Sequence, residues 1–91
     1  MAVPEHTIHY LEIVTPDVEA ARRLYATAYG WRFQAMGPEL GNAFVAELPG
    51  GSRCGIRAPM HAEERPIVRT YLRVADVAKA VETAAHLGGT I

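Results

Sequence analysis

Apolar and polar residues alternate over residues 7–14, and this period of two predicts a β-strand. Leu11 and Ile13 then share one face of the strand, while Tyr10 and Glu12 share the other. We expect the face with Leu11 and Ile13 to pack against a helix. The face with Tyr10 and Glu12 is expected to line a cavity.

A helix start follows directly in Thr15-Pro16-Asp17. The side chain of Thr15 or Asp17 can cap the free N–H groups, and Pro16 suits a first turn because its missing N–H is not needed there. Apolar residues then recur at helical spacing as far as Gly30, which has the position of a C-terminal stop. The apolar residues of this predicted helix are Ala20, Ala21, Leu24, Tyr25 and Ala28.

Three further strands are predicted at residues 31–36, 43–48 and 52–57. The last two are joined by Pro49-Gly50-Gly51, which is typical of a hairpin. The pattern then begins again with a strand at 67–74. A helix opened by Asp76 follows, then Gly88-Gly89, and Thr90-Ile91 starts another strand. The apolar face of this second helix comprises Val77, Ala80, Val81, Ala84 and Leu87.

The chain therefore contains an internal repeat. A shift of 59 residues (13 to 72) places Ile13 on Leu72, Asp17 on Asp76 and Gly30 on Gly89. A repeat of this kind indicates two similar supersecondary units. The first unit has the order β-α-β-β-β, and the second stops after its helix.

We predict an α+β fold in a single domain over residues 1–91, built from two βαβββ modules that form an open U-shaped sheet. Module one covers 7–58, a linker covers 59–66, and a partial module two covers 67–91, truncated after its helix. Natural proteins avoid unpaired sheet edges. We therefore expect the natural chain to continue beyond residue 91, or a second chain to supply the missing strands.

The residues from Ile8 to Tyr25, followed by Tyr29-Gly30-Trp31, resemble the opening of the vicinal oxygen chelate superfamily, which includes glyoxalases, bleomycin resistance proteins and extradiol dioxygenases. The segments 74–77 and 87–90 are similar to its second module, so the resemblance covers essentially the whole chain. It implies a small-molecule ligand inside the U. In enzymes of the superfamily, His, Glu or Gln side chains hold a divalent metal there, which acts as a Lewis acid.

The metal ligands implied by the resemblance are not clearly present. Aligned without a gap from Asp17, the first ligand position falls on Tyr10. His9 takes that position only after a one-residue shift, which turns the side chain to the opposite face. The other visible ligand positions fall near Gly55 or Ile56 and on Arg69 or Thr70. We therefore predict no cofactor, with a divalent metal as the alternative and His9 as its candidate ligand.

The repeat relates Tyr10 to Arg69 and Glu12 to Tyr71. We predict that these four residues line the cavity and contact the ligand, with an Arg–Glu pair among them because a buried carboxylate needs a partner. No catalytic residue is assigned. Trp31 and Phe33 are expected in the core or its rim, with stacking on a ligand as the alternative. Cys54 is expected to be an unreactive strand residue. Arg57 is expected to be an exposed strand-end residue, with a position at the cavity mouth as the alternative.

Charge and composition exclude several classes of function. The net charge is −1, so the chain lacks the basic surface that nucleic acid requires. No run of about 18 apolar residues predicts a membrane span. A single cysteine excludes a disulfide framework and suits a cytoplasmic protein. A chain this small is marginally stable alone, so a homodimer is expected.

Two functions from different classes follow. The first is a small-molecule-binding protein of the superfamily that captures a partly aromatic ligand. The alternative is a divalent-metal-dependent enzyme, either a glyoxalase-like lyase or an extradiol-dioxygenase-like enzyme. A third reading is a subunit whose open sheet edge serves assembly.

Overall fold

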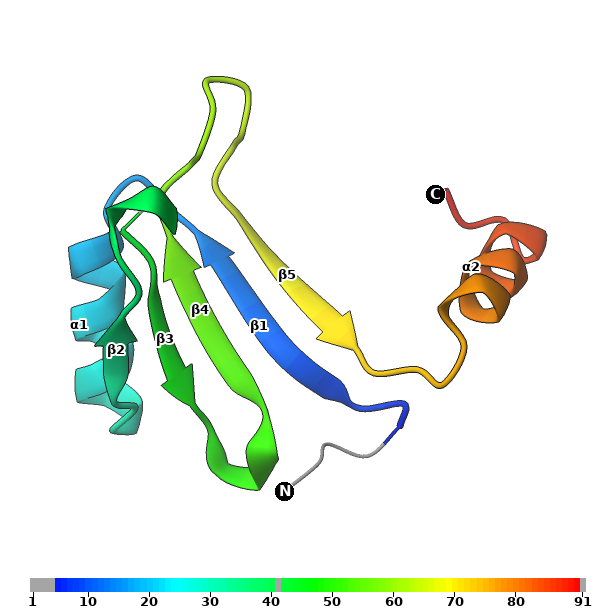
Figure 1. The fold of residues 1–91 in the computed structure, drawn as a ribbon, viewed down its shortest axis with the longest axis horizontal. Helices are drawn as coiled ribbons and strands as arrows, with labels where there is room; N and C mark the ends of the chain where they lie inside the picture. Colours follow the sequence, from blue (N-terminus) through cyan, green and yellow to red (C-terminus); the bar gives the residue numbers. More distant parts are fainter. Residues whose placement is uncertain (1–4, 41, 91) are drawn as a thin grey trace.

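β1 (Ile8–Val14) is the strand around which the sheet is built in the computed structural model (Figure 1). It pairs in parallel with β4 (Arg53–Arg57) and antiparallel with β5 (Ile67–Leu72). β3 (Phe44–Glu47) and β2 (Phe33–Ala35) extend the sheet on the far side of β4. The strand order is therefore β2-β3-β4-β1-β5, a mixed open sheet.

The structure describes residues 5–40 and 42–90. Within them, the five strands and two helices, α1 (Val18–Tyr29) and α2 (Val77–His86), form an α+β domain. The predicted class of fold is therefore confirmed. The first half of the chain has the order β1-α1-β2-β3-β4, and the segment 58–66 carries no helix or strand.

Capping signals in the sequence set the helix ends. The Asp17 carboxylate accepts a hydrogen bond from the N–H of Ala20 at 3.0 Å, and Asp76 does the same for Lys79 at 3.0 Å. Gly30 ends α1 with a positive φ of 71°, a conformation that glycine adopts without steric cost. The predicted helix positions are confirmed.

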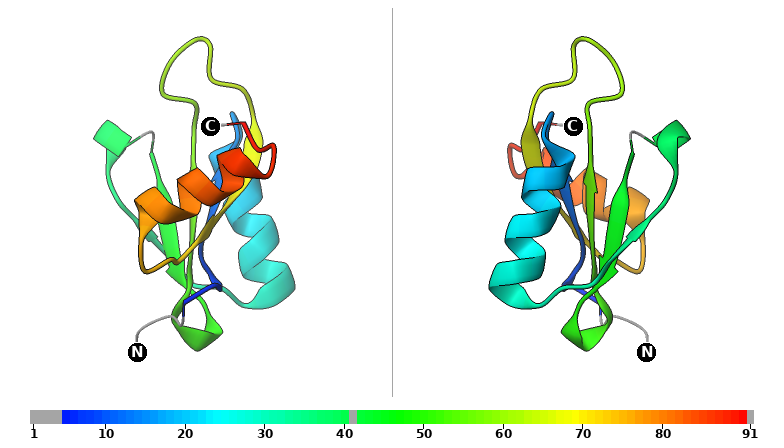
Figure 2. Two further views of the ribbon diagram at one scale, coloured as in Figure 1. Left: turned by 90° about the vertical axis from the view of Figure 1, so that its right-hand side faces the viewer. Right: turned by 90° about the vertical axis from the view of Figure 1, so that its left-hand side faces the viewer.

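The core lies between α1 and one face of the sheet, which Figure 2 views from both edges. Ile13, Val18, Cys54 and Ile56 are buried there, and partly buried side chains such as Leu11 pack around them. The expectation that Leu11 and Ile13 face the helix is therefore confirmed. The position of Cys54 follows from strand alternation, because Leu11 and Cys54 are register partners in the β1–β4 ladder.

The predicted apolar face of α1 is partly wrong. Ala21 and Tyr25 pack against the core, but Leu24 is 61% exposed, and Ala20 and Ala28 are exposed too. A helix on a narrow sheet has only one side covered, so a broad apolar stripe extends beyond the contact.

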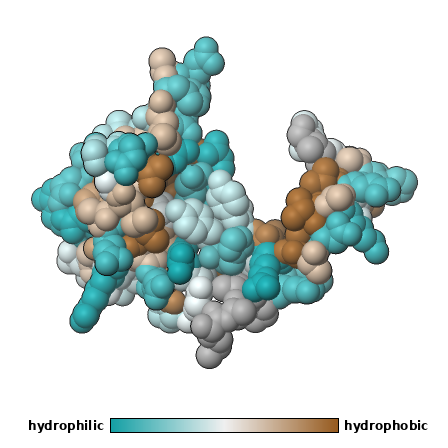
Figure 3. All heavy atoms as spheres, in the orientation of Figure 1, coloured by the Kyte–Doolittle hydropathy of each residue, from teal (hydrophilic) through white to brown (hydrophobic). Residues whose placement is uncertain are grey.

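The second helix stands apart from the sheet (Figure 1). None of its residues is buried. Val77, at its start, is 67% exposed, and Leu87, which caps its C-terminal end, is 78% exposed. Its hydrophobic side is visible beside the hollow that separates it from the sheet (Figure 3). The predicted apolar face exists in the helix, but within the described residues no strand follows β5 for it to cover.

Strand lengths also differ from the prediction. Trp31 and Arg32 precede β2, which has only three residues, because the chain is still leaving the turn at Gly30. β3 and β4 form the predicted hairpin around Pro49–Gly51, which forms a 3-10 turn. Thr90 is in no strand, and residue 91 lies outside the described residues.

No helix in the described part of the chain is long and apolar enough to cross a membrane. The cytoplasmic location and the homodimer stay predictions.

Replacing Ile56 with Ala should lower the free energy of unfolding by about 3 kcal/mol, because a fully buried side chain leaves a cavity. Ile8→Ala is the matched control, since Ile8 is 50% exposed, and it should cost about 1 kcal/mol or less. Urea denaturation measures both changes. Equal losses would contradict the assignment of the core.

Candidate functional site

The pairing of β1 with β5 brings the four predicted site residues together. Tyr10 is the register partner of Tyr71, and Glu12 is the partner of Arg69. Their side chains lie on the face of the sheet opposite α1, because the alternating residues Leu11 and Ile13 face the helix. The rings of Tyr10 and Tyr71 meet edge to face, with their centroids 5.7 Å apart.

The Glu12 carboxylate is the centre of this group. Its Oε1 accepts hydrogen bonds from Arg69 Nη1 at 3.0 Å and from Tyr71 Oη at 3.0 Å. Its Oε2 accepts a hydrogen bond from Arg57 Nε at 3.2 Å. The Glu12 side chain is only 15% exposed, so these donors replace most of the water that a carboxylate would otherwise bind. The expected Arg–Glu pair is therefore present.

These contacts determine the protonation of the group. Burial alone would raise the pKa of Glu12, but hydrogen bonds from Arg69, Tyr71 and Arg57 outweigh it and lower that pKa. The hydrogen bond to Glu12 raises the pKa of Tyr71, and burial raises the pKa of Tyr10. At neutral pH the site therefore presents an ionised carboxylate beside two protonated phenols.

Arg57 extends the network to the segment between β4 and β5. Its Nη1 and Nη2 donate to both carboxylate oxygens of Glu64, at 2.6 and 2.7 Å. Oε1 of Glu64 also accepts the N–H of Met60 at 2.8 Å. The pKa of Glu64 falls to about 2 through these hydrogen bonds, and the same pairing raises the pKa of Arg57. One guanidinium thus ties residues 58–66 to Glu12.

Sequence reasoning missed Glu64 and named Arg57 only as an alternative at the cavity mouth. The first expectation for Arg57, an exposed strand-end residue, was wrong, because its side chain is only 19% exposed. Alternation along β4 contains a signal, since Gly55 is the partner of Glu12 and Arg57 is two residues further on the same face. Glu64 lies in an irregular segment, where no periodicity indicates which way a side chain points.

Tyr10 packs directly over Gly55. A Cβ atom added to Gly55 would lie 1.7 Å from Tyr10 Oη and 2.7 Å from Tyr10 Cζ. Gly55 therefore gives the phenol room to lie against the sheet, and the two residues together close this part of the open face.

A cavity of about 440 Å³ adjoins Tyr10 on the open face. Its volume is within the range of small-molecule sites, roughly 300–1,000 Å³. The residues that line it are His9, Tyr10, Met36, Val45, Gly51, Arg53 and Arg73.

The residues present do not fit a divalent metal. Within the described ranges, no group of at least three His, Cys, Asp or Glu side chains is arranged to hold a metal ion. His9 is exposed, and the carboxylate of Glu12 is already engaged by two guanidinium groups and a phenol. Burial raises the pKa of Cys54 to about 11, so its thiol stays protonated and is no candidate nucleophile.

The contact between Tyr10 and Gly55 can be tested by a double-mutant cycle. Gly55→Ala should cost about 1–3 kcal/mol in the free energy of unfolding, because the new methyl group displaces the ring. In a Tyr10→Ala background the same change should be neutral or stabilising, as expected for Gly→Ala at a compatible position. Chemical denaturation of the four proteins measures the coupling, and additive effects would contradict the contact.

The pH dependence of stability should report Glu64. Its folded pKa of about 2 lies below its ordinary value of 4.5, so its contribution is present above pH 4.5 and is lost towards pH 2. Glu64→Gln should therefore be less stable than the parent at pH 6, and the difference should shrink as the pH falls. Thermal melts measure this. Glu82→Gln, at an exposed position of α2, is the control and should show no such convergence.

Comparison with known proteins finds no family model that matches the chain and no curated protein with significant similarity to it. The resemblance to the vicinal oxygen chelate superfamily therefore stays a prediction. The case for function rests on the side chains of the open face.

Proposed function

We propose that this chain binds a small, partly aromatic molecule on the open face of its sheet, as a member of the vicinal oxygen chelate superfamily. In this proposal the chain has two βαβββ modules forming a U-shaped sheet, the second truncated after its helix. The observation that carries the proposal is the convergence of Tyr10, Glu12, Arg69 and Tyr71 on one face of the β1–β5 pair.

The register of β1 and β5 supports the two modules. Leu11 pairs with Thr70, and the repeat shift of 59 residues relates these same two positions. The pairs Tyr10–Tyr71 and Glu12–Arg69 flank this point symmetrically. Two copies of one unit joined through their first strands around a two-fold axis would produce such a ladder.

Ligand binding is supported by the mixture of rigid and accessible groups. Arg57 binds one oxygen of the Glu12 carboxylate and so fixes its position. The other oxygen then keeps Arg69 and Tyr71 oriented before a ligand binds. Arg69 is 44% exposed and can turn part of its guanidinium to a polar group of a ligand. Tyr10 and Tyr71 supply aromatic surface beside the adjoining cavity.

The same contacts favour binding over metal-dependent catalysis. A metal at this face would have to displace Arg57 and Arg69 from the only carboxylate that the four-residue group contains. Glu12 also has little tendency to accept a proton, because three donors stabilise its ionised form. The lyase or dioxygenase alternative therefore has less support from these residues.

We also propose that the chain forms a homodimer. Val68 and Leu72 of β5 are 60% and 59% exposed, and the apolar residues of α2 are exposed as well. Apolar surface of this kind commonly marks an interface.

Protein-observed NMR of a ¹⁵N-labelled sample, titrated with a library of one- and two-ring aromatic fragments, tests the function. Bound fragments should shift the backbone amide signals of Tyr10, Glu12, Arg69 and Tyr71. Tyr71→Ala should weaken binding roughly tenfold, since a ring contact contributes about 1–1.5 kcal/mol. Arg65→Gln is the control and should leave affinity unchanged. Shifts confined to other elements would contradict the site, and stoichiometric zinc or manganese in the purified protein would favour the enzyme instead.

A further inference from the structure

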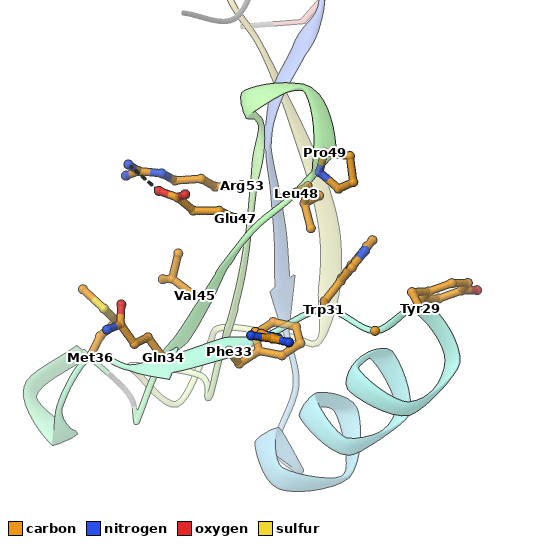
Figure 4. A pocket seen from close by; sticks show the side chains of 12 residues that line it. Tyr29, Trp31, Phe33, Gln34, Met36, Val45, Glu47, Leu48, Pro49 and Arg53 are labelled. Atoms are coloured by element: carbon orange, nitrogen blue, oxygen red, sulfur yellow. Dashed lines mark hydrogen bonds and ion pairs between the residues drawn. The ribbon is translucent and has the colours of Figure 1, made fainter. Parts of the chain in front are cut away.

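A second cavity lies at the end of the β2–β3 pair (Figure 4). Its volume is about 800 Å³, which suits a molecule of two or three rings. It shares Met36, Val45 and Arg53 with the cavity beside Tyr10, so the two spaces adjoin. Its other lining residues are Tyr29, Gly30, Trp31, Arg32, Phe33, Gln34, Glu47, Leu48 and Pro49.

Aromatic rings form one end of this cavity. Gly30 turns the chain at the end of α1, so that Trp31 stacks on Tyr25 with centroids 5.5 Å apart and planes 7° from parallel. Tyr29 and Phe33 lie 5.4 and 6.5 Å from Trp31. Trp31 and Phe33 also pack against the buried core, which holds these rings in place. The result is a fixed aromatic wall of the kind that binds flat apolar molecules.

Charged groups lie at the other end. Figure 4 shows the Glu47–Arg53 pair on the other side of β3 from Tyr29 and Trp31. The last pair between β2 and β3 is Phe33 with Ala46, so β2 does not cover the end of β3, and the cavity extends around that end. This pair is long, at 3.4 Å, and the side chains of Arg53 and Glu47 are 60% and 80% exposed. Such a pair contributes little to stability, so Arg53 can change partners at small cost. Arg32 also lines the cavity and has no ion pair within the described part of the chain.

We infer that this cavity binds a planar aromatic anion, such as an aromatic carboxylate. The ring system would lie against Trp31 and Phe33, and the carboxylate would face Arg32 and Arg53. Two arginines and one glutamate among the lining residues favour an anion over a cation. A charge-assisted bond to guanidinium supplies selectivity over a neutral molecule of the same shape. This site shares Arg53 with the cavity beside Tyr10, but none of Tyr10, Glu12, Arg69 and Tyr71 lines it.

Trp31 is the only tryptophan, so a ¹⁵N-labelled sample gives a single indole N–H signal that needs no further assignment. The probe is 2-naphthoate, and its neutral isostere 2-naphthamide is the matched control. We expect a saturable shift of the indole signal with 2-naphthoate and about tenfold weaker binding of 2-naphthamide. No shift of the indole signal, or equal affinities for the two probes, would overturn the proposal.

Variants then locate the anion. Arg32→Gln, and more strongly Arg32→Gln with Arg53→Gln, should lower the affinity for 2-naphthoate towards that of 2-naphthamide and leave 2-naphthamide binding unchanged. Arg69→Gln should leave both affinities unchanged, which separates this site from the proposed function. Dispersed amide spectra confirm that each variant folds. Loss of both probes to the same extent in Arg32→Gln would count against the assigned role of the arginines.

Discussion

The carboxylate of Glu12 is the constraint on which much of the open face depends. It lies in the middle strand of the β4-β1-β5 group and is mostly screened from water. An ionised group in such a position must be paired, since an unpaired one costs several kcal/mol. The partners come from three places: Arg57 at the end of β4, and Arg69 and Tyr71 on β5. Pairing this one charge therefore connects side chains of β4 and β5 to β1, in addition to the backbone ladders between these strands.

Arg57 carries the constraint further, because its guanidinium serves two carboxylates at once. The group that donates through Nε to Glu12 donates through both Nη atoms to Glu64. Glu64 in turn accepts the N–H of Met60. The irregular segment between β4 and β5, which has no ladder of its own, is ordered by a chain of charges that begins in the sheet. Removing the Glu12 carboxylate by mutation would leave Arg57 and Arg69 without the acceptor that they share.

Local patterns predicted much of this arrangement. The alternation over β1 gave the correct faces for Leu11 and Glu12, and capping residues such as Asp17 and Asp76 gave the helix starts. Hydrophobic periodicity and helix capping depend on residues that are close in the sequence, so they can be read from a single sequence. The repeat also predicted that Tyr10, Glu12, Arg69 and Tyr71 would share a face, because related positions in two similar strands do so. It placed Arg69 opposite Tyr10 and Tyr71 opposite Glu12, and this was wrong: the antiparallel ladder pairs Tyr10 with Tyr71 and Glu12 with Arg69.

Other features depend on long-range geometry. The short β2 strand follows from the turn at Gly30, and the exposure of Leu24 follows from how little of the sheet α1 covers. Neither the length of β2 nor the exposure of Leu24 is visible in the local pattern of apolar residues, so the sequence could not predict them. Glu64 lies in a segment without periodicity, and its role depends on where Arg57 projects from another element. Arg57 and Glu64 are 7 residues apart, and the segment between them is irregular. No periodic spacing in the sequence therefore indicates that these two side chains form a pair.

The close approach of Tyr10 to Gly55 links fold and chemistry most directly. Gly55 has no side chain, and the phenol occupies the space that a larger residue would fill. In a strand, glycine weakens packing unless a neighbouring ring covers it, and Tyr10 supplies that cover. This part of β1 and β4 is therefore covered by an aromatic ring lying on bare backbone. Positive charge on this face comes instead from Arg57 and Arg69, which are fixed to Glu12. Such a surface can recognise a ligand through shape and hydrogen bonds, and the Glu12 carboxylate is already committed to holding that shape.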